Sequence, residues 1–205
     1  MPPSTKIILP TAPRRNVSVN GSTVMPSWFD IKEFYAPANP WGAYDGYLQR
    51  ELRGSVSIVL DLLLKEVTSL GDPRRVFLGG FSQGASVALA AFLQFKHGPL
   101  GGVVGLSGAH CADIAWSGLD LQKLRKTKMF LYHGEADSVL PASLAERSYQ
   151  MFKEKRLDCA FETEPGLGHG VSDELMQKLA RFLKTNRKDV VELGTSTTLK
   201  PWQSW

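Results

Sequence analysis

The sequence is poor in cysteine, in long apolar runs and in clustered basic charge, and each absence excludes a class of protein. Two cysteines, Cys111 and Cys159, are too few and too far apart for a disulfide scaffold or a zinc site. The longest apolar run extends only from Val87 to Leu93, well short of the ~18–20 residues that span a bilayer. The net charge of +4 comes without a basic stripe, so we expect no nucleic-acid partner.

The 205 residues, 43% apolar and 21% charged, are typical of one globular domain. The N-terminal residues do not have the pattern of a signal peptide, which together with the scarce cysteine favours a reduced, cytoplasmic protein. We expect the domain to cover residues 1–186 and residues 187–205, which lack any period, to form a flexible tail. Trp202 and Trp205 in this tail are candidates for contact with a membrane surface or a partner, or belong to a tail without such a role.

Strand-like runs alternate with helical patterns along the chain. Apolar residues from Leu48 to Val67 recur every three or four positions, which predicts an amphipathic helix over 45–69. Strands are expected at 6–10, 76–78, 103–107, 129–132 and 160–163, further helices at 83–95, 142–155 and 172–185, and an irregular excursion at 11–43. Apolar strands that alternate with helices indicate an α/β protein of three layers, with a mostly parallel sheet of about five strands.

The segment Gly80-Phe81-Ser82-Gln83-Gly84 matches the pattern G-x-S-x-G between a predicted strand and a predicted helix, the setting of a nucleophile elbow. Larger side chains at the two glycines would collide with the adjoining strand and helix. The helix directs its N-terminal N–H groups at the site, which favours developing negative charge. The pattern predicts Ser82 as nucleophile and the backbone N–H of Gln83 as oxyanion donor.

A nucleophilic serine needs a base and an acid that orients the base, and in this type of fold both follow the serine in loops after later strands. His169 lies between glycines after the last predicted strand and is the expected base. Asp137, just past the strand at 129–132, is the expected acid, with Glu135 as its competitor. His133 ends the same strand, where a structural hydrogen bond is the expected role.

Four segments in register resemble the acyl-protein thioesterase and small carboxylesterase family of α/β-hydrolases. They are Pro10–Pro13 with Trp28–Asp30, Gly79–Gly84, His133–Pro141 and Gly168–His169. The resemblance implies the α/β-hydrolase fold and a serine hydrolase that cleaves acyl thioesters or esters, including S-palmitoylated proteins and lysophospholipids, without metal or organic cofactor. Ser82 would attack the acyl carbonyl, His169 would move the proton, and Asp137 would hold the imidazole.

The sequence departs from the family pattern in two places. The family carries a further N-terminal segment whose His-Gly-x-Gly-Asp loop supplies a second oxyanion N–H, and no such motif occurs here. We therefore expect an N-terminally truncated sheet, in which the strands at 6–10 and 76–78 either pair directly or leave a partly open edge. The loop Ser107–Cys111 replaces an aromatic-Leu-Pro stretch, which indicates an altered acyl-chain preference. The alternative function is a catalytically impaired α/β-hydrolase-like protein that binds lipid or a protein partner.

Apolar residues in three loops are candidates for substrate binding. Met25, Trp28 and Phe29 form an apolar stretch in a polar N-terminal region and would line an acyl groove, since ligand sites are mostly apolar. Leu140 and Leu167 would contribute from the acid and base loops. Trp28 and Phe29 fit equally well as anchors that pin the long loop to the core.

Overall fold

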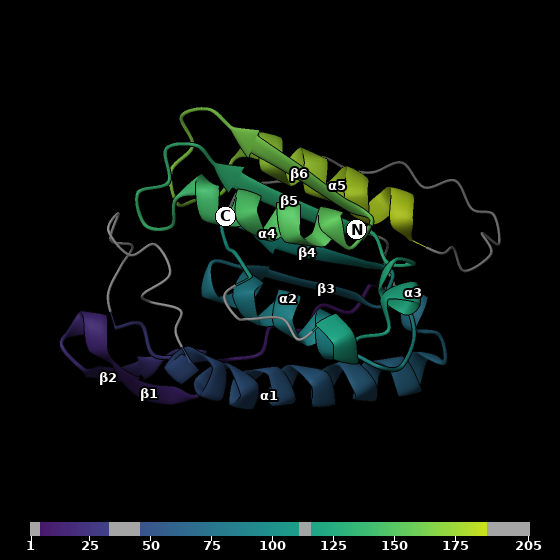
Figure 1. Ribbon diagram of the computed structural model, residues 1–205, viewed down its shortest axis with the longest axis horizontal. Coiled ribbons are helices and arrows are strands. Elements are labelled where there is room, and N and C mark those ends of the chain that lie inside the picture. Colours follow the sequence, from purple (N-terminus) through teal and green to yellow (C-terminus); the bar gives the residue numbers. More distant parts are fainter. Residues whose placement is uncertain (1–4, 33–45, 111–115, 188–205) are drawn as a thin grey trace.

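The computed structural model describes residues 5–32, 46–110 and 116–187, and for residues 46–51 only the helical backbone. Its centre is a parallel sheet of four strands in the order β3-β4-β5-β6 (Figure 1). These strands are β3 (Phe77–Phe81), β4 (Gly102–Leu106), β5 (Met129–Gly134) and β6 (Cys159–Glu164). Because neighbouring strands run in the same direction, their carboxyl ends meet at one edge of the sheet.

Successive residues of the central strands face opposite sides of the sheet and build two separate cores. Val103, Met129 and Leu131 belong to the larger core, whereas Val104, Phe130 and Tyr132 belong to the smaller one. This alternation is the period of two of a β-strand, with both faces covered. The continuous apolar composition of β4 and β5 follows from it, because neither face of these strands meets water.

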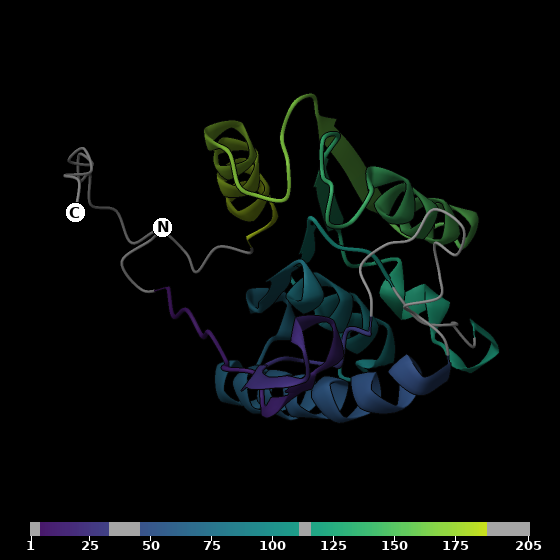
Figure 2. The ribbon, with the colours of Figure 1, turned by 90° about the vertical axis from the view of Figure 1, so that its left-hand side faces the viewer.

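Helices cover the two faces unequally. The larger core lies against α2 (Gln83–Gln94) and α4 (Ala142–Glu154), and α5 (Asp173–Asn186) covers the smaller core. Figure 2 shows α4 and α5 on opposite sides of the sheet. The predicted three-layer α/β architecture is therefore confirmed.

The long helix α1 (Gly46–Leu70) packs on α2 as an outer element. Of the residues that the periodicity placed on its apolar face and whose side chains are described, Leu60 is partly buried and the others are buried: Leu52, Val56, Val59, Leu63 and Val67. Helix formation and burial thus follow from one stripe of apolar residues. Two short elements, the 3₁₀ turn η4 (Trp116–Gly118) and α3 (Leu121–Leu124), lie between β4 and β5.

The N-terminal region differs from its prediction in two ways. No strand forms at Lys6–Pro10 within the described residues; Lys6 instead pairs with Glu66 of α1 at 2.8 Å, and Leu9 is 86% exposed. Pro10, the last residue of this segment, lacks the N–H that a paired strand needs, which disfavours pairing there. The sheet therefore has four described strands rather than about five, and β3 pairs there with β4 alone. Among the described strands, the segment at 6–10 does not pair with β3, so the expected direct pairing is not found.

A hairpin replaces part of the expected irregular excursion. β1 (Arg14–Val17) and β2 (Thr23–Pro26) pair antiparallel through the 3₁₀ turn η1 (Ser18–Asn20), with Gly21 in the left-handed conformation (φ 64°). Asn20-Gly21 is a hairpin signal that the sequence contains. The later part of the excursion, residues 33–43, lies outside the described residues, as do Cys111, Trp202 and Trp205.

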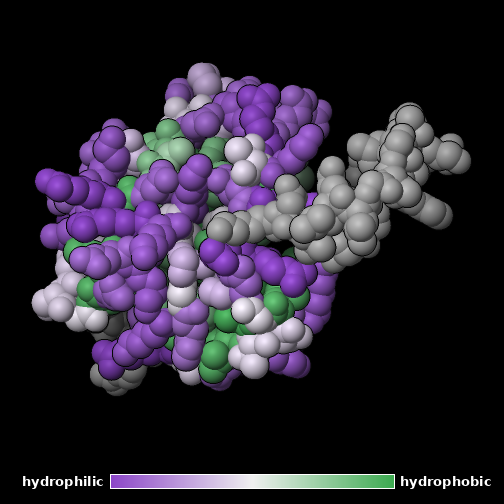
Figure 3. Space-filling model, turned by 90° about the vertical axis from the view of Figure 1, so that its right-hand side faces the viewer, coloured by the Kyte–Doolittle hydropathy of each residue, from purple (hydrophilic) through white to green (hydrophobic). Residues whose placement is uncertain are grey.

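The described surface is mainly polar. Figure 3 shows one face, on which hydrophilic residues predominate and hydrophobic ones form small separate patches. In the part of the chain that the structure describes, no helix has both the length and the apolar character to cross a membrane. The expected tail at 187–205 is described only at Arg187, so the division into domain and tail stays a prediction.

Candidate active site

Ser82 lies at the sharp turn between β3 and α2. Its backbone has φ 54° and ψ −121°, a conformation that side-chain-bearing residues rarely adopt, and its N–H donates to the Leu106 carbonyl at 2.8 Å. Such a residue costs about 1–3 kcal/mol and persists when the surrounding structure holds it. The elbow predicted from the G-x-S-x-G pattern is therefore present, with Ser82 just before the first residue of the helix.

The two glycines of the pattern have different structural roles. A Cβ atom on Gly80 would lie 2.1 Å from the Gly84 carbonyl oxygen and 2.5 Å from the Ala85 nitrogen, so only glycine fits there. A Cβ on Gly84 would meet nothing closer than Trp28 Nε1 at 3.9 Å, an ordinary contact. The steric argument is confirmed for Gly80; at Gly84 a Cβ atom fits beside Trp28, so the argument does not extend to alanine there.

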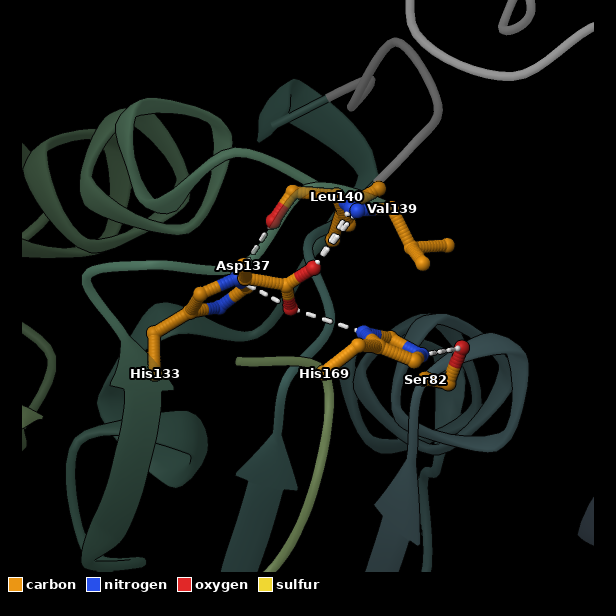
Figure 4. A network of polar contacts seen from close by, with 6 residues as sticks. All are labelled: Ser82, His133, Asp137, Val139, Leu140 and His169. Carbon is orange, nitrogen blue, oxygen red and sulfur yellow. Dashed lines mark hydrogen bonds and ion pairs between the residues drawn. The ribbon is translucent and has the colours of Figure 1, made fainter. Parts of the chain in front are cut away.

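The loops after β5 and β6 bring Asp137 and His169 to Ser82, as Figure 4 shows. His169 Nε2 lies 2.9 Å from Ser82 Oγ, and His169 Nδ1 lies 2.7 Å from Asp137 Oδ2. A carboxylate accepts hydrogen bonds, so His169 carries its proton on Nδ1 and presents the Nε2 lone pair to the Ser82 hydroxyl. This arrangement can take a proton from Ser82 while Asp137 holds the ring in place.

The Asp137 carboxylate is buried and hydrogen-bonded on both oxygens. Its Oδ1 accepts from the backbone N–H groups of Val139 and Leu140, each at 2.9 Å. The competing acid, Glu135, accepts instead from the Thr163 hydroxyl at 2.7 Å. The geometry thus separates the two acids: Asp137 is the one that contacts His169.

A second histidine touches the same carboxylate. His133 is completely buried, and its Nε2 lies 2.7 Å from the Leu140 carbonyl oxygen and 3.2 Å from Asp137 Oδ2. Burial is the main cause that lowers the pKa of His133. The expected structural hydrogen bond of His133 is present. The sequence reasoning missed its contact with Asp137, because that contact depends on how the loop after β5 folds back over the end of the strand.

The loop that carries His169 is fixed at both ends. Glu164, the last residue of β6, accepts from the Tyr132 hydroxyl at 2.7 Å and from the Ser172 hydroxyl at 2.5 Å, and Ser172 in turn caps α5. The Ala136 N–H donates to the Leu167 carbonyl at 2.9 Å, which joins the acid loop to the base loop. The His169 ring lies 5.0 Å from the ring of Phe81. These contacts hold the imidazole over the end of β3.

Gln83 connects the elbow to the N-terminal region. Its side-chain oxygen accepts from the Trp28 N–H at 2.7 Å, and its Nε2 donates to the Phe29 carbonyl at 2.7 Å and to the Ser27 hydroxyl at 2.9 Å. Its own backbone N–H lies in the first turn of α2, where N–H groups have no acceptor within the helix. Gln83 is thus placed both to clamp the loop at 27–29 and to donate a hydrogen bond at the site.

The remaining substrate-binding candidates lie in different surroundings. Phe29 is 4% exposed within the larger core, which supports its interpretation as an anchor, and Trp28 packs beside it, partly buried. Met25 receives a hydrogen bond on sulfur from Asn20. Leu167 packs against the smaller core, and Leu140 borders Asp137 through its backbone. Substrate contact by these five residues stays a prediction.

No group of three or more metal-ligating side chains is found within residues 5–32, 46–110 and 116–187. Cys159 is a free thiol, and burial raises its pKa to about 12, which makes it a poor nucleophile at neutral pH.

A profile of the phospholipase/carboxylesterase family matches residues 1–187. The chain belongs to this family. Acyl-protein thioesterase 1 of Gibberella zeae is 32% identical over 185 residues, which are 87% of this chain and 76% of that protein. The enzyme of the same name from Yarrowia lipolytica is 36% identical over 192 residues, 90% of this chain and 79% of that protein. The crystal structure of Arabidopsis thaliana SOBER1 superposes with a TM-score of 0.74 at 27% identity, covering 87% of this chain and 82% of that one.

The fold of this phospholipase/carboxylesterase family member is therefore the α/β-hydrolase fold, as the resemblance implied. Membership supports an esterase or thioesterase activity. It does not favour the alternative of a lipid-binding or partner-binding protein without activity.

Proposed function

We propose that the protein hydrolyses acyl esters or thioesters through a covalent acyl-Ser82 intermediate. The observation that carries the proposal is the continuous chain of hydrogen bonds from Ser82 through His169 to Asp137 at the carboxyl end of the sheet. Ligands bind at this edge in open α/β sheets. The three residues come from loops after three different strands, so their convergence is a property of the fold rather than of one local sequence.

The chemistry follows from the hydrogen-bond directions. Ser82 Oγ attacks the acyl carbonyl carbon while its proton passes to His169 Nε2, and Asp137 stabilises the resulting imidazolium. Collapse of the tetrahedral intermediate expels the thiol or alcohol, which takes the proton from His169. Water then attacks the acyl-enzyme with His169 again as base, and this second addition and collapse releases the carboxylic acid and restores Ser82.

The backbone N–H of Gln83 is the proposed donor to the oxyanion of both tetrahedral intermediates. It lies at the positive end of α2, directly after the nucleophile. One such donor contributes about 2.7–4 kcal/mol to transition-state stabilisation.

The proposed substrates are acylated proteins, lysophospholipids or small carboxylic esters. The relatives named acyl-protein thioesterase 1 support an acyl group on a protein thiol. Exposed apolar side chains flank the three site residues in sequence: Phe81 before Ser82, Val139 after Asp137 and Val171 after His169. They offer apolar contact to a fatty-acyl chain that approaches Ser82.

The proposal is tested with a fluorophosphonate, which labels a serine that a neighbouring base has activated. Intact-mass analysis should show one adduct on the wild-type chain and on Ser57→Ala, a control at an exposed position of α1, and none on Ser82→Ala. Hydrolysis of a p-nitrophenyl ester should fall at least about 10³-fold in Ser82→Ala. Absence of an adduct on cooperatively folded wild-type protein would refute the proposal and favour the non-catalytic alternative.

A further inference from the structure

We propose that His133 is a positioning residue for the site: its Nε2–H holds the loop at 137–140 closed around Asp137 and so keeps the carboxylate aimed at His169. The proposal rests on the proposed function and adds to it a residue that does not touch substrate. Figure 4 shows the whole set, with His133 and His169 approaching Asp137 from two sides.

The hydrogen-bond partners determine where the His133 proton lies. Its Nε2 faces two acceptors, the Leu140 carbonyl oxygen at 2.7 Å and Asp137 Oδ2 at 3.2 Å. Neither can donate while Asp137 is ionised, so Nε2 carries the hydrogen and His133 is a donor to both. The shorter distance makes the carbonyl the main partner and the carboxylate the secondary one.

The surroundings of the other ring nitrogen, Nδ1, offer no acceptor for a second N–H of His133. His133 Nδ1 is buried and has no hydrogen-bond partner among the described residues. Burial, the main cause, and the nearby His169 both lower the pKa of His133, whereas the Leu140 carbonyl and Asp137 raise it. With its one N–H at Nε2 and no partner at Nδ1, His133 acts on this loop as a single hydrogen-bond donor.

The four donors on Asp137 divide between its two oxygens. The N–H groups of Val139 and Leu140 occupy Oδ1, and the two imidazoles share Oδ2. Leu140 connects the donors of the two oxygens: its N–H donates to Oδ1, while its carbonyl accepts from His133, which also contacts Oδ2. Loss of the His133 donor would remove the hydrogen bond that ties the Leu140 carbonyl to the end of β5 and would free the loop to move away from that strand.

The expected effect of that movement is a loss of rate without loss of substrate binding. A displacement of the order of 1 Å in a catalytic arrangement can cost about 10²-fold in rate. We expect kcat for a p-nitrophenyl ester to fall about 10- to 100-fold in His133→Phe, with KM within about two-fold of wild type. The rate of fluorophosphonate labelling at Ser82 should fall in parallel.

Three substitutions separate positioning from space filling. His133→Phe keeps a ring but has no donor, and His133→Asn has a donor too short to reach the Leu140 carbonyl. His133→Gln places an amide N–H near the position of the imidazole Nε2 and should recover most of the rate. Should His133→Phe fail to fold, the comparison of His133→Asn with His133→Gln still decides the question.

Proton NMR supplies a readout that does not depend on turnover. The downfield resonance of the His169 Nδ1 proton, shared with Asp137, should broaden or shift in His133→Phe and His133→Asn and return in His133→Gln. Wild-type rate and resonance in folded His133→Phe or His133→Asn would overturn the proposal, and so would equal losses in His133→Asn and His133→Gln. An unlabelled wild-type protein would instead refute the proposed function, while the resonance would still report on His133.

Discussion

At the scale of single residues, the site depends on two backbones that approach each other more closely than a side chain allows. The strand β3 and the first turn of α2 nearly touch at Gly80, where a Cβ would fall 2.1 Å from the Gly84 carbonyl oxygen. This approach turns the chain sharply enough to put Ser82 in its strained conformation, φ 54°. The close approach of β3 and α2 at Gly80 therefore places Ser82 at the tip of the turn.

The two glycines of the elbow should respond in opposite ways to alanine. In Gly80→Ala the new methyl group must displace the backbone of α2, so we expect a loss of about 1–3 kcal/mol in the free energy of unfolding, or more, and loss of fluorophosphonate labelling. Gly84→Ala has room for its methyl group and should gain up to about 1 kcal/mol from higher helix propensity. Urea unfolding and labelling kinetics measure both effects. Labelling of Gly80→Ala at the wild-type rate would contradict the steric argument.

The Gln83 side chain should matter for stability through the loop that it clamps. Gln83→Ala removes the acceptor of the Trp28 backbone N–H and one of two donors to the Phe29 carbonyl, which keeps the Ser27 hydroxyl at 2.6 Å. Loss of a partner for the Trp28 N–H costs about 1–3 kcal/mol. The backbone N–H of residue 83 is retained, so Ser82 should still be labelled by a fluorophosphonate. Urea unfolding with an exposed-site control, Lys65→Ala on α1, measures the cost. A variant as stable as this control would show that the clamp does not hold the loop.

At the scale of elements, α5 is held to the sheet by one side of its surface. Leu175 is fully buried against Val104, Phe130 and Tyr132, whereas its neighbour Met176 is 50% exposed. The two positions differ by one step along the helix, which is about 100° around its axis. Since α5 directly follows the His169 loop, its attachment to the sheet also fixes that loop.

Alanine substitutions at these neighbouring positions should therefore differ strongly. Leu175→Ala removes fully buried methyl groups and should lower the free energy of unfolding by about 2–5 kcal/mol. Met176→Ala should stay within about 0.5 kcal/mol of wild type, as is usual for a surface position. Chemical denaturation of the two variants measures the difference, and similar values would show that α5 is not packed as described.

Elements with a strong internal pattern could be predicted from the sequence, and those that depend on a partner could not. The stripe from Leu52 to Val67 and the apolar runs of β4 and β5 determine a helix and two buried strands by their own periodicity. The segment Lys6–Pro10 has strand-like composition, but pairing requires a neighbour, and the segment lies against α1 through Lys6 instead. The hairpin around Asn20-Gly21 was missed although its turn residues signal it.

The same distinction applies to the site. The sequence could predict that Ser82, Asp137 and His169 lie close together, because each follows a strand of one parallel sheet and the carboxyl ends of these strands meet at one edge. Their catalytic roles stay predictions. The contact of His133 with Asp137 depends on how the loop at 137–140 folds back over the end of β5, which no periodicity encodes.

At the scale of the whole molecule, Glu164 joins elements from both sides of the smaller core. Its carboxylate accepts hydrogen bonds from Tyr132 on β5 and from Ser172 at the start of α5, while Glu164 itself ends β6. Burial and the hydrogen bond to Glu164 raise the pKa of Tyr132 to about 12, so this hydroxyl remains a donor throughout the neutral range. The hydrogen bonds from Ser172 and then from Tyr132 lower the pKa of Glu164.

Stability should therefore depend on the ionisation of Glu164, with a definite sign. Because the pKa of Glu164 is lower in the folded state than its ordinary value of 4.5, its contribution is fully present above that value and is lost as the pH falls through the folded-state pKa. Glu164→Gln keeps one acceptor oxygen but no charge, so it should be less stable than wild type at about pH 7 and approach wild type as the pH falls toward about 3.

Glu162→Gln, on the same strand but paired at the surface with Lys178, should change the free energy of unfolding by less than about 1 kcal/mol. Urea unfolding of the three proteins across this pH range measures the difference; a gap between wild type and Glu164→Gln that is unchanged from pH 7 to pH 3 would mean that the charge of Glu164 does not hold these elements together.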